Sequence, residues 1–172
     1  MPGDAHSHAA RAARARLQRR YRPCPVRMLF VGESPPASGR FFYRCDSGLY
    51  RAIREAFCAI DPTLTDDDFL AAFQAAGCYL IDLCPDPVDH MDPQSRRAAC
   101  VASERSLART IRKLQPQTIV TVVLSIRENV ERSTAHADWH GPVFNLPYPG
   151  RWSRHRDIFV TTLAPLLRSL RG

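Results

Sequence analysis

The sequence predicts an α/β fold, a three-layer α/β/α sandwich with a central, mainly parallel four-stranded sheet. Short apolar runs typical of buried strands alternate along the chain with segments of helical periodicity. Parallel neighbouring strands need crossover connections, which these helical segments supply. At 172 residues the chain has the size of one domain. We therefore expect residues 23–172 to form a single domain, preceded by an Arg-rich helix or extension over residues 1–22.

The first half of the chain supplies two strands and two helices. Residues 27–32 (RMLFVG) form an apolar run that ends in glycine and suits a strand buried on both faces. Ser47 is a suitable N-cap for a helix over 47–57, where apolar residues recur at helical spacing. A second helix is expected over 65–77, because its first turn is acidic and a glycine ends it. Residues 78–83 (CYLIDL) form the next strand.

The second half supplies the other two strands. Asp92 followed by Pro93 predicts the start of a long helix that ends near Leu114. β-Branched residues dominate 118–124 (TIVTVVL), the clearest strand signal in the chain. The remaining elements are a helix over 126–136, a short strand over 143–146 and a closing helix over 153–170, which Pro165 can kink.

Composition and charge exclude several classes of protein. No segment reaches the roughly 18 to 20 apolar residues of a membrane span, and the N-terminal stretch lacks the apolar core of a secretory signal, so we expect a cytoplasmic protein. We also expect a monomer. The cysteines form no CxxC pair, and we expect no metal and no cofactor. The net charge of +7, carried mostly by arginine, has two explanations. One is an anionic partner such as DNA, and the other is a general preference for arginine in the source genome.

The segments that follow the four strands are the candidate site, because open parallel sheets bind ligands outside the carboxyl ends of their strands. Gly32 allows a ligand to approach the backbone closely. Glu33 places a carboxylate at the strand end, where it can orient a water or balance a cation. Arg40 and the aromatic run 41–43 combine a cation with flat rings that suit an unstacked base. Core packing is the competing explanation for each ring.

The segment after the fourth strand has the features of a phosphate-binding loop. Gly150, Arg151, Ser153 and Arg154 place cations and a hydroxyl at the start of a helix, where free backbone N–H groups favour anions. An ordinary solvated helix start is the alternative. Ser125, after the third strand, adds another hydroxyl at the same edge of the sheet.

The stretch GESPPASGRFFYRCDSGLYRAI resembles the first motif of the uracil-DNA glycosylase superfamily, especially its thermophilic-type and single-strand-selective relatives, without their iron–sulfur cysteines. YLIDLCP and LPYPGRWSRHRDIF match the second strand and the last motif of that family, in the same order. The resemblance implies hydrolysis of the N-glycosidic bond of a flipped damaged or deaminated base in DNA. Phe42 would stack on the base and Glu33 would lie near the water. The implied base-binding residues are Gly32, Ser34, Phe42, Asp82 and Tyr148, and the implied phosphate-binding residues are Arg40, Ser125, Gly150, Arg151, Ser153 and Arg154.

Two positions depart from the family pattern. Leu146 stands where the family has a histidine that stabilises negative charge on the departing base, and leucine has no side-chain donor. Tyr148, Arg151 or His155 are the candidates to replace that histidine. Asp82 stands where the family has an asparagine. An ionised Asp offers only acceptors, whereas a protonated Asp can pair with N3 and N4 of cytosine. The other explanation for Asp82 is a cap of the following loop.

Three functions therefore stay open. The first is a DNA glycosylase-like hydrolase of DNA base-excision repair, and the second is a catalytically silent nucleic-acid-binding module of the same fold. The third and weaker one is a binder or hydrolase of nucleosides or nucleotides, since a fold alone does not fix function.

Overall fold

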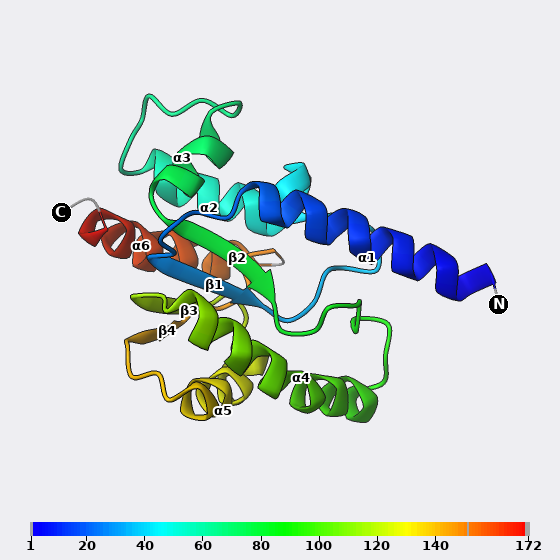
Figure 1. Ribbon diagram of the computed structural model, residues 1–172. Helices are drawn as coiled ribbons and strands as arrows, with labels where there is room; N and C mark the ends of the chain where they lie inside the picture. Colours follow the sequence, from blue (N-terminus) through cyan, green and yellow to red (C-terminus); the bar gives the residue numbers. More distant parts are fainter. Residues whose placement is uncertain (1, 151, 171–172) are drawn as a thin grey trace.

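Four parallel strands form the central sheet of the computed structural model, which describes residues 2–150 and 152–170 (Figure 1). The strands are β1 (Met28–Gly32), β2 (Cys78–Asp82), β3 (Thr118–Thr121) and β4 (Val143–Asn145), in the spatial order β2-β1-β3-β4. The register pairs Gly32 with Asp82, and Thr121 with Asn145. All four carboxyl ends therefore lie at the same edge of the sheet, as a parallel arrangement requires.

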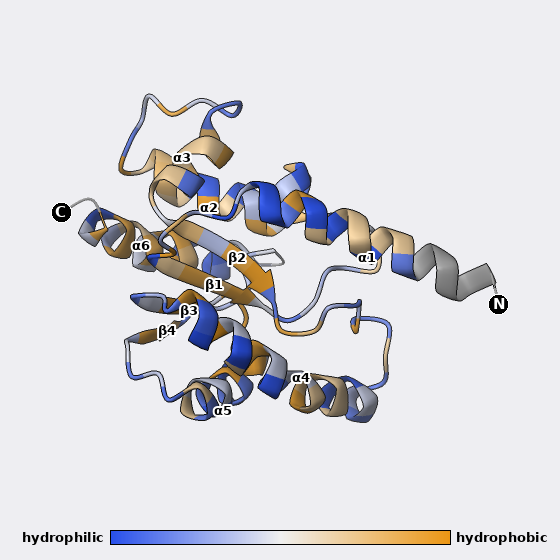
Figure 2. Cartoon of the chain, viewed as in Figure 1, coloured by the Kyte–Doolittle hydropathy of each residue, from blue (hydrophilic) through white to orange (hydrophobic). Residues whose placement is uncertain are grey.

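Helices cover both faces of this sheet (Figure 1). On one face α2 (Gly48–Cys58) packs against α6 (Ser153–Ser169), and α3 (Phe69–Ala75) packs against β2. On the other face α4 (Pro93–Leu114) packs against α5 (Arg127–Ala137). The strands between them are predominantly apolar (Figure 2). The expected three-layer α/β/α sandwich is confirmed.

Local sequence signals set several helix ends as predicted. The Ser47 side chain accepts a hydrogen bond from the Tyr50 N–H at the start of α2. The Asp92 side chain accepts from the second and third residues of α4, behind Pro93 at the first helical position. Gly77, with φ of +78°, follows the end of α3. Pro165 lies within α6, which runs to Ser169 as one helix.

Two elements, α3 and β3, are shorter than predicted by more than one residue. α3 begins at Phe69 instead of Thr65, because residues 66–68 form a turn in which the Phe69 N–H donates to the Asp66 carbonyl at 3.3 Å. The Thr65 hydroxyl donates to Asp68 Oδ2 at 2.6 Å, and the Asp68 N–H donates back to that hydroxyl at 3.3 Å. These local bonds cap the turn that precedes the helix. β3 ends at Thr121 because a 3₁₀ turn, η2 (Leu124–Ile126), redirects the chain.

The Arg-rich N-terminal segment forms helix α1 (Pro2–Arg20), which docks against the outer edge of β2. Gln18 Nε2 donates to the Leu80 carbonyl at 2.9 Å, and Arg14 Nη2 donates to the Pro85 carbonyl at 3.2 Å. Tyr21, just after the helix, stacks on Tyr43 with ring centroids 5.6 Å apart. The helix therefore covers an edge strand whose backbone groups would otherwise be free to pair with another chain.

Replacing Tyr43 by phenylalanine is expected to lower the free energy of unfolding by about 1–3 kcal/mol. The buried Tyr43 hydroxyl accepts from the Leu80 N–H at 2.8 Å and donates to the Leu80 carbonyl at 3.0 Å, so its removal leaves that buried N–H without a partner. Urea unfolding measures the loss. Tyr148→Phe is the control, because that side chain is 44% exposed and its loss of a hydroxyl should change stability by less than about 0.5 kcal/mol. Equal effects of the two changes would contradict the role of Tyr43 at the strand edge.

Candidate active site at the carboxyl edge of the sheet

Asp82 ends β2 directly opposite Gly32 of β1. A Cβ atom at Gly32 would lie 2.5 Å from Asp82 Oδ1, so glycine at this position lets the carboxylate keep its place against the backbone of β1. No hydrogen bond or ion pair from residues 8–150 or 152–170 reaches the Asp82 carboxylate. The next two backbone N–H groups, of Leu83 and Cys84, donate to the carbonyls of Gly32 and Glu33. Asp82 therefore does not cap the following loop, and its carboxyl group is available to a ligand.

The surroundings of Asp82 favour its protonated form. Burial raises the pKa of Asp82 to about 7, the positive charge of Arg14 opposes this shift, and the negative charge of Glu33 adds to it. Burial also raises the pKa of Tyr148. The positive charge of Arg51 opposes this shift, and the negative charge of Asp82 adds to it. Near neutral pH, Asp82 thus exists in both states and can accept or donate a hydrogen bond.

Glu33 forms an ion pair and is not the free carboxylate that the family resemblance implies. Arg96 of α4 donates from Nε to Glu33 Oε1 at 2.8 Å and from Nη2 to Oε2. The pair lines a cavity of about 460 Å³ that also contains Ser125. Side chains alternate along a strand, so Asp82 points to the face covered by α3 while Glu33 points toward α4. The two carboxylates therefore belong to different sides of the sheet.

Phe42 belongs to the hydrophobic core, which corrects its expected role as the ring that stacks on a base. It lies in the 3₁₀ turn η1 (Phe42–Arg44) and is 3% exposed. Its ring contacts the rings of Tyr43, Tyr50, Phe69 and Phe73, with centroids 5.0 to 6.3 Å apart. The 3₁₀ turn directs the ring inward, and no face of it is left for a ligand. Core packing is therefore the correct explanation for Phe42 and Tyr43.

Tyr148 and Arg51 converge at the N-terminus of α2. A Cβ atom at Gly48 would lie 3.8 Å from Arg51 Nη2 and 4.0 Å from the Tyr148 hydroxyl. A Cβ atom at Gly150 would lie 2.3 Å from the Tyr148 ring, so glycine is needed where the loop folds over that ring. Sequence reasoning missed Arg51, because within a helical pattern an arginine has no feature that separates it from a solvated residue.

The other predicted residues lie apart from Asp82 or are already engaged. The Ser34 hydroxyl accepts from the Val88 N–H at 3.2 Å and so ties two loops together. Arg40 is exposed, and no ion pair joins it to another residue in the described part of the chain. Ser153 and Arg154 are exposed in the first turn of α6, and Arg151 lies outside the described residues. Trp152 beside them is 64% exposed. Leu146, at the family's histidine position, is buried at 2% exposure.

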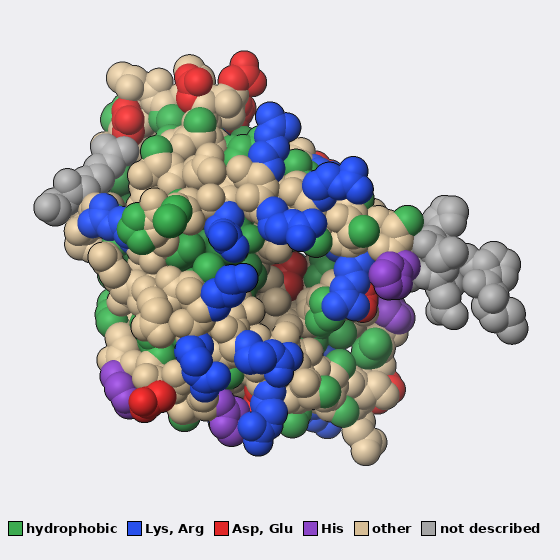
Figure 3. Space-filling model, viewed as in Figure 1, with side chains coloured by type: hydrophobic (Ala, Val, Ile, Leu, Met, Phe, Trp, Pro, Cys, Tyr) green, Lys and Arg blue, Asp and Glu red, His purple; other side chains and the backbone are tan. Residues whose placement is uncertain are grey.

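Asp82 also lines a cavity of about 400 Å³ along the outer edge of β2, between α1 and α4. We call this cavity the edge groove. Its cationic lining residues are Arg11, Arg14, Arg22 and Lys113, and its ring-bearing ones are Phe41 and Tyr79. Figure 3 shows acidic atoms within a hollow on this face, with Lys and Arg side chains on several sides. Phe41 also lines this cavity, but its side chain is only 4% exposed and belongs to the hydrophobic core like Phe42 and Tyr43.

Among the residues that the structure describes, no three His, Cys, Asp or Glu side chains are grouped so that they could hold a metal ion. No described helix is both long and apolar enough to cross a membrane. No family model matches the sequence, and no curated protein matches it. The geometry around Asp82 therefore carries the functional argument.

Proposed function

We propose that the protein is a DNA glycosylase-like hydrolase that breaks the N-glycosidic bond of a flipped damaged or deaminated base. The observation that carries this proposal is the Asp82 carboxyl group, which lies against Gly32 at the carboxyl edge of the sheet without a hydrogen-bond partner among the described residues. Asp82 is half-buried, and withdrawing even part of a carboxyl group from water without a partner is costly, so such a group at the ligand-binding edge of a sheet is a candidate for function. A ligand with N–H donors would satisfy it.

The chemistry of Asp82 suits a nucleobase. In its ionised form the carboxylate accepts from an exocyclic amine, and in its protonated form it pairs with a donor and an acceptor side by side. Since its pKa is about 7, both forms are available at neutral pH. As the N-glycosidic bond breaks, its electron pair leaves with the base, the protonated form of Asp82 can supply a proton to that base, and a water adds to the sugar carbon and gives its proton back to the carboxylate. Asp82 thereby combines base recognition with the role of general acid.

The loop that carries Tyr148 suits the nucleic-acid backbone. Trp152 offers a flat apolar face at 64% exposure, and Ser153 and Arg154 follow it at the exposed start of α6. Arg51 adds a cation beside Tyr148. Arginine and an exposed aromatic together favour phosphate contacts and base stacking. These features support DNA as the partner.

A second candidate, a catalytically silent nucleic-acid binder, is favoured by Leu146 and Glu33. The buried Leu146 side chain has no donor for the departing base. The Glu33 carboxylate is already engaged in an ion pair with Arg96. A protein of this kind would retain DNA in a salt-dependent way and release no base.

The test is release of bases from labelled oligonucleotides that contain uracil, hypoxanthine, xanthine or an alkylated base, each single- and double-stranded, with alkali to reveal abasic sites. The wild type is expected to release at least one base. Asp82→Asn should change the relative rates among bases by about 10- to 100-fold, because an amide offers a donor that an ionised Asp lacks. Glu33→Gln tests the second carboxylate in the same assay.

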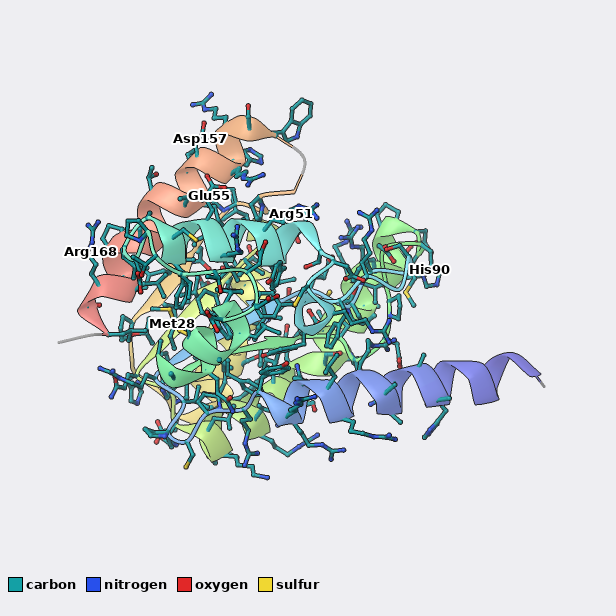
Figure 4. All side chains as sticks on the ribbon, turned by 90° about the horizontal axis from the view of Figure 1, so that it is seen from above. Met28, Arg51, Glu55, His90, Asp157 and Arg168 are labelled. Atoms are coloured by element: carbon teal, nitrogen blue, oxygen red, sulfur yellow. The ribbon has the colours of Figure 1, made fainter. Side chains whose placement is uncertain are left out.

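Asp157→Asn is the matched control, because it makes the same acid-to-amide change on the exposed surface of α6 (Figure 4). It should release bases like the wild type. Failure of the wild type to release any base, together with salt-dependent retention of the oligonucleotides, would reject hydrolysis and select the silent binder.

A further inference from the structure

The edge groove has a strongly unequal charge distribution. Its lining contains the four cations Arg11, Arg14, Arg22 and Lys113 but only one carboxylate, Asp82. The groove lies where α1 passes along the outer edge of β2, so three of the four cations come from the Arg-rich N-terminal segment. The docking of α1 therefore converts a compositional excess of arginine into a localised binding surface.

These cations are available to an anion. Arg11 reaches Asp86 at 3.4 Å, and these two side chains are 53% and 45% exposed, so this ion pair contributes little and exchanges readily for a better anion. Arg14 reaches Asp86 at 3.6 Å, but it is only 16% exposed and also donates to the Pro85 carbonyl, so it adds positive charge to the wall of the groove from a fixed position. Arg22 and Lys113 form no ion pair with any residue of 8–150 or 152–170. A phosphate group, which guanidinium groups bind in a bidentate manner, would satisfy several of these donors at once.

The interior of the groove selects against a purely acidic partner. Asp82 lies in the lining and repels carboxylates, but it accepts hydrogen bonds from N–H groups. Phe41 and Tyr79 also line the groove, at 4% and 5% exposure, so they form its apolar wall. A partner that presents N–H donors on a flat ring to Asp82 and an anion to the arginines fits both ends. Nucleotides have this combination, whereas acidic peptides do not.

We propose that the edge groove binds a nucleotide, with its base toward Asp82 and its phosphate among the cations contributed by α1, the residues after it, and α4. The inference deepens the proposed function and rests on it, because both use Asp82. It adds the N-terminal segment to the binding surface and names the phosphate-bearing nucleotide, either free or within a single strand, as the unit that is bound.

The experiment measures binding to the full chain at several salt concentrations. The probes are a labelled mixed-sequence single-stranded oligonucleotide, the corresponding duplex, and cytidine monophosphate as a free nucleotide. The test variant is the double charge reversal Arg22→Glu/Lys113→Glu. The matched control is Arg105→Glu/Arg168→Glu, which changes the net charge equally at exposed positions outside the groove lining; Figure 4 labels Arg168 at the end of α6, far from α1.

The test variant is expected to weaken strand binding by about 100-fold at low salt and to reduce the slope of log affinity against log salt by about 1.4, the value for two phosphate contacts on a single strand. The control should lose less than tenfold. Equal losses of strand affinity in both variants, or no loss in either, would overturn the proposal that the edge groove binds a nucleotide. Sensitivity of cytidine monophosphate binding to the same reversal identifies a free nucleotide, and sensitivity of the strand alone identifies nucleic acid.

Base release separates this inference from the proposed function. If the wild type binds through the groove but releases no base, the proposal of hydrolysis is rejected and the proposal of nucleotide binding in the groove is kept. If the wild type releases a base and the Arg22→Glu/Lys113→Glu variant keeps the wild-type KM, nucleotide binding in the groove is rejected and the proposal of hydrolysis is kept. If the wild type binds none of the probes, the groove is rejected outright.

Discussion

Phe42→Ala is expected to lower the free energy of unfolding by about 3–5 kcal/mol, the usual loss when a fully packed phenylalanine is truncated. The Phe42 ring is 3% exposed and contacts four other aromatic rings from η1, α2 and α3. Truncation would leave a cavity between these elements, and the surrounding rings are themselves too tightly packed to fill it. Urea unfolding followed by circular dichroism measures the loss. For a domain with a free energy of unfolding of about 10 kcal/mol, this loss removes about a third to a half of that free energy.

Trp152→Ala is the control for this prediction. Its side chain is 64% exposed, so the change should alter stability by no more than about 0.5 kcal/mol. The same two variants also separate packing from binding. Trp152→Ala is expected to weaken oligonucleotide binding without a loss of stability. A stable Phe42→Ala variant that has lost oligonucleotide binding would instead restore Phe42 to the role of base platform.

The fold was predictable because its signals are local. The buried strand pattern, the Asp92-Pro93 helix start and the Ser47 cap each depend on residues that are close in sequence, and each was confirmed. The start of α3 was predicted wrongly at Thr65 because the same aspartates that favour a helix dipole also favour a turn. In the structure the Phe69 N–H bonds to the Asp66 carbonyl three residues back, so residues 66–68 form a turn.

The candidate site was predictable only in part. Gly32 and Asp82 were expected at the same edge, since parallel strands bring their carboxyl ends together, and the register places them opposite each other. The pairing of Glu33 with Arg96 joins residues 63 positions apart and has no sequence signal. Which ring of the run 41–43 turns inward depends on the 3₁₀ geometry of η1, which three consecutive aromatics do not reveal.

Asp82 is expected to make a contribution to the free energy of unfolding that decreases as pH rises from about 4 to about 7. Burial raises the pKa of this carboxyl group from 3.8 to about 7, so in this range the folded state holds a proton that the unfolded state has released. Unfolding is therefore favoured progressively as pH increases, and the full loss is present above pH 7. A difference of this size corresponds to about 4 kcal/mol at most. The sign is opposite to that of a carboxylate stabilised by an ion pair.

Asp82→Asn isolates this contribution, because the amide has a similar shape and does not ionise. Compared with the wild type, the variant should be about equally stable near pH 4 and more stable by up to about 4 kcal/mol at pH 8. Urea unfolding of both proteins across this range measures the difference, in which the contributions of other carboxylates cancel. Asp157→Asn should stay within about 0.5 kcal/mol of the wild type. A gain in stability at pH 8 combined with altered base release would indicate that the chain keeps a destabilising carboxylate for its chemistry. An equal difference at pH 4 and pH 8 would mean that water solvates Asp82, and the general-acid role proposed for it would fall.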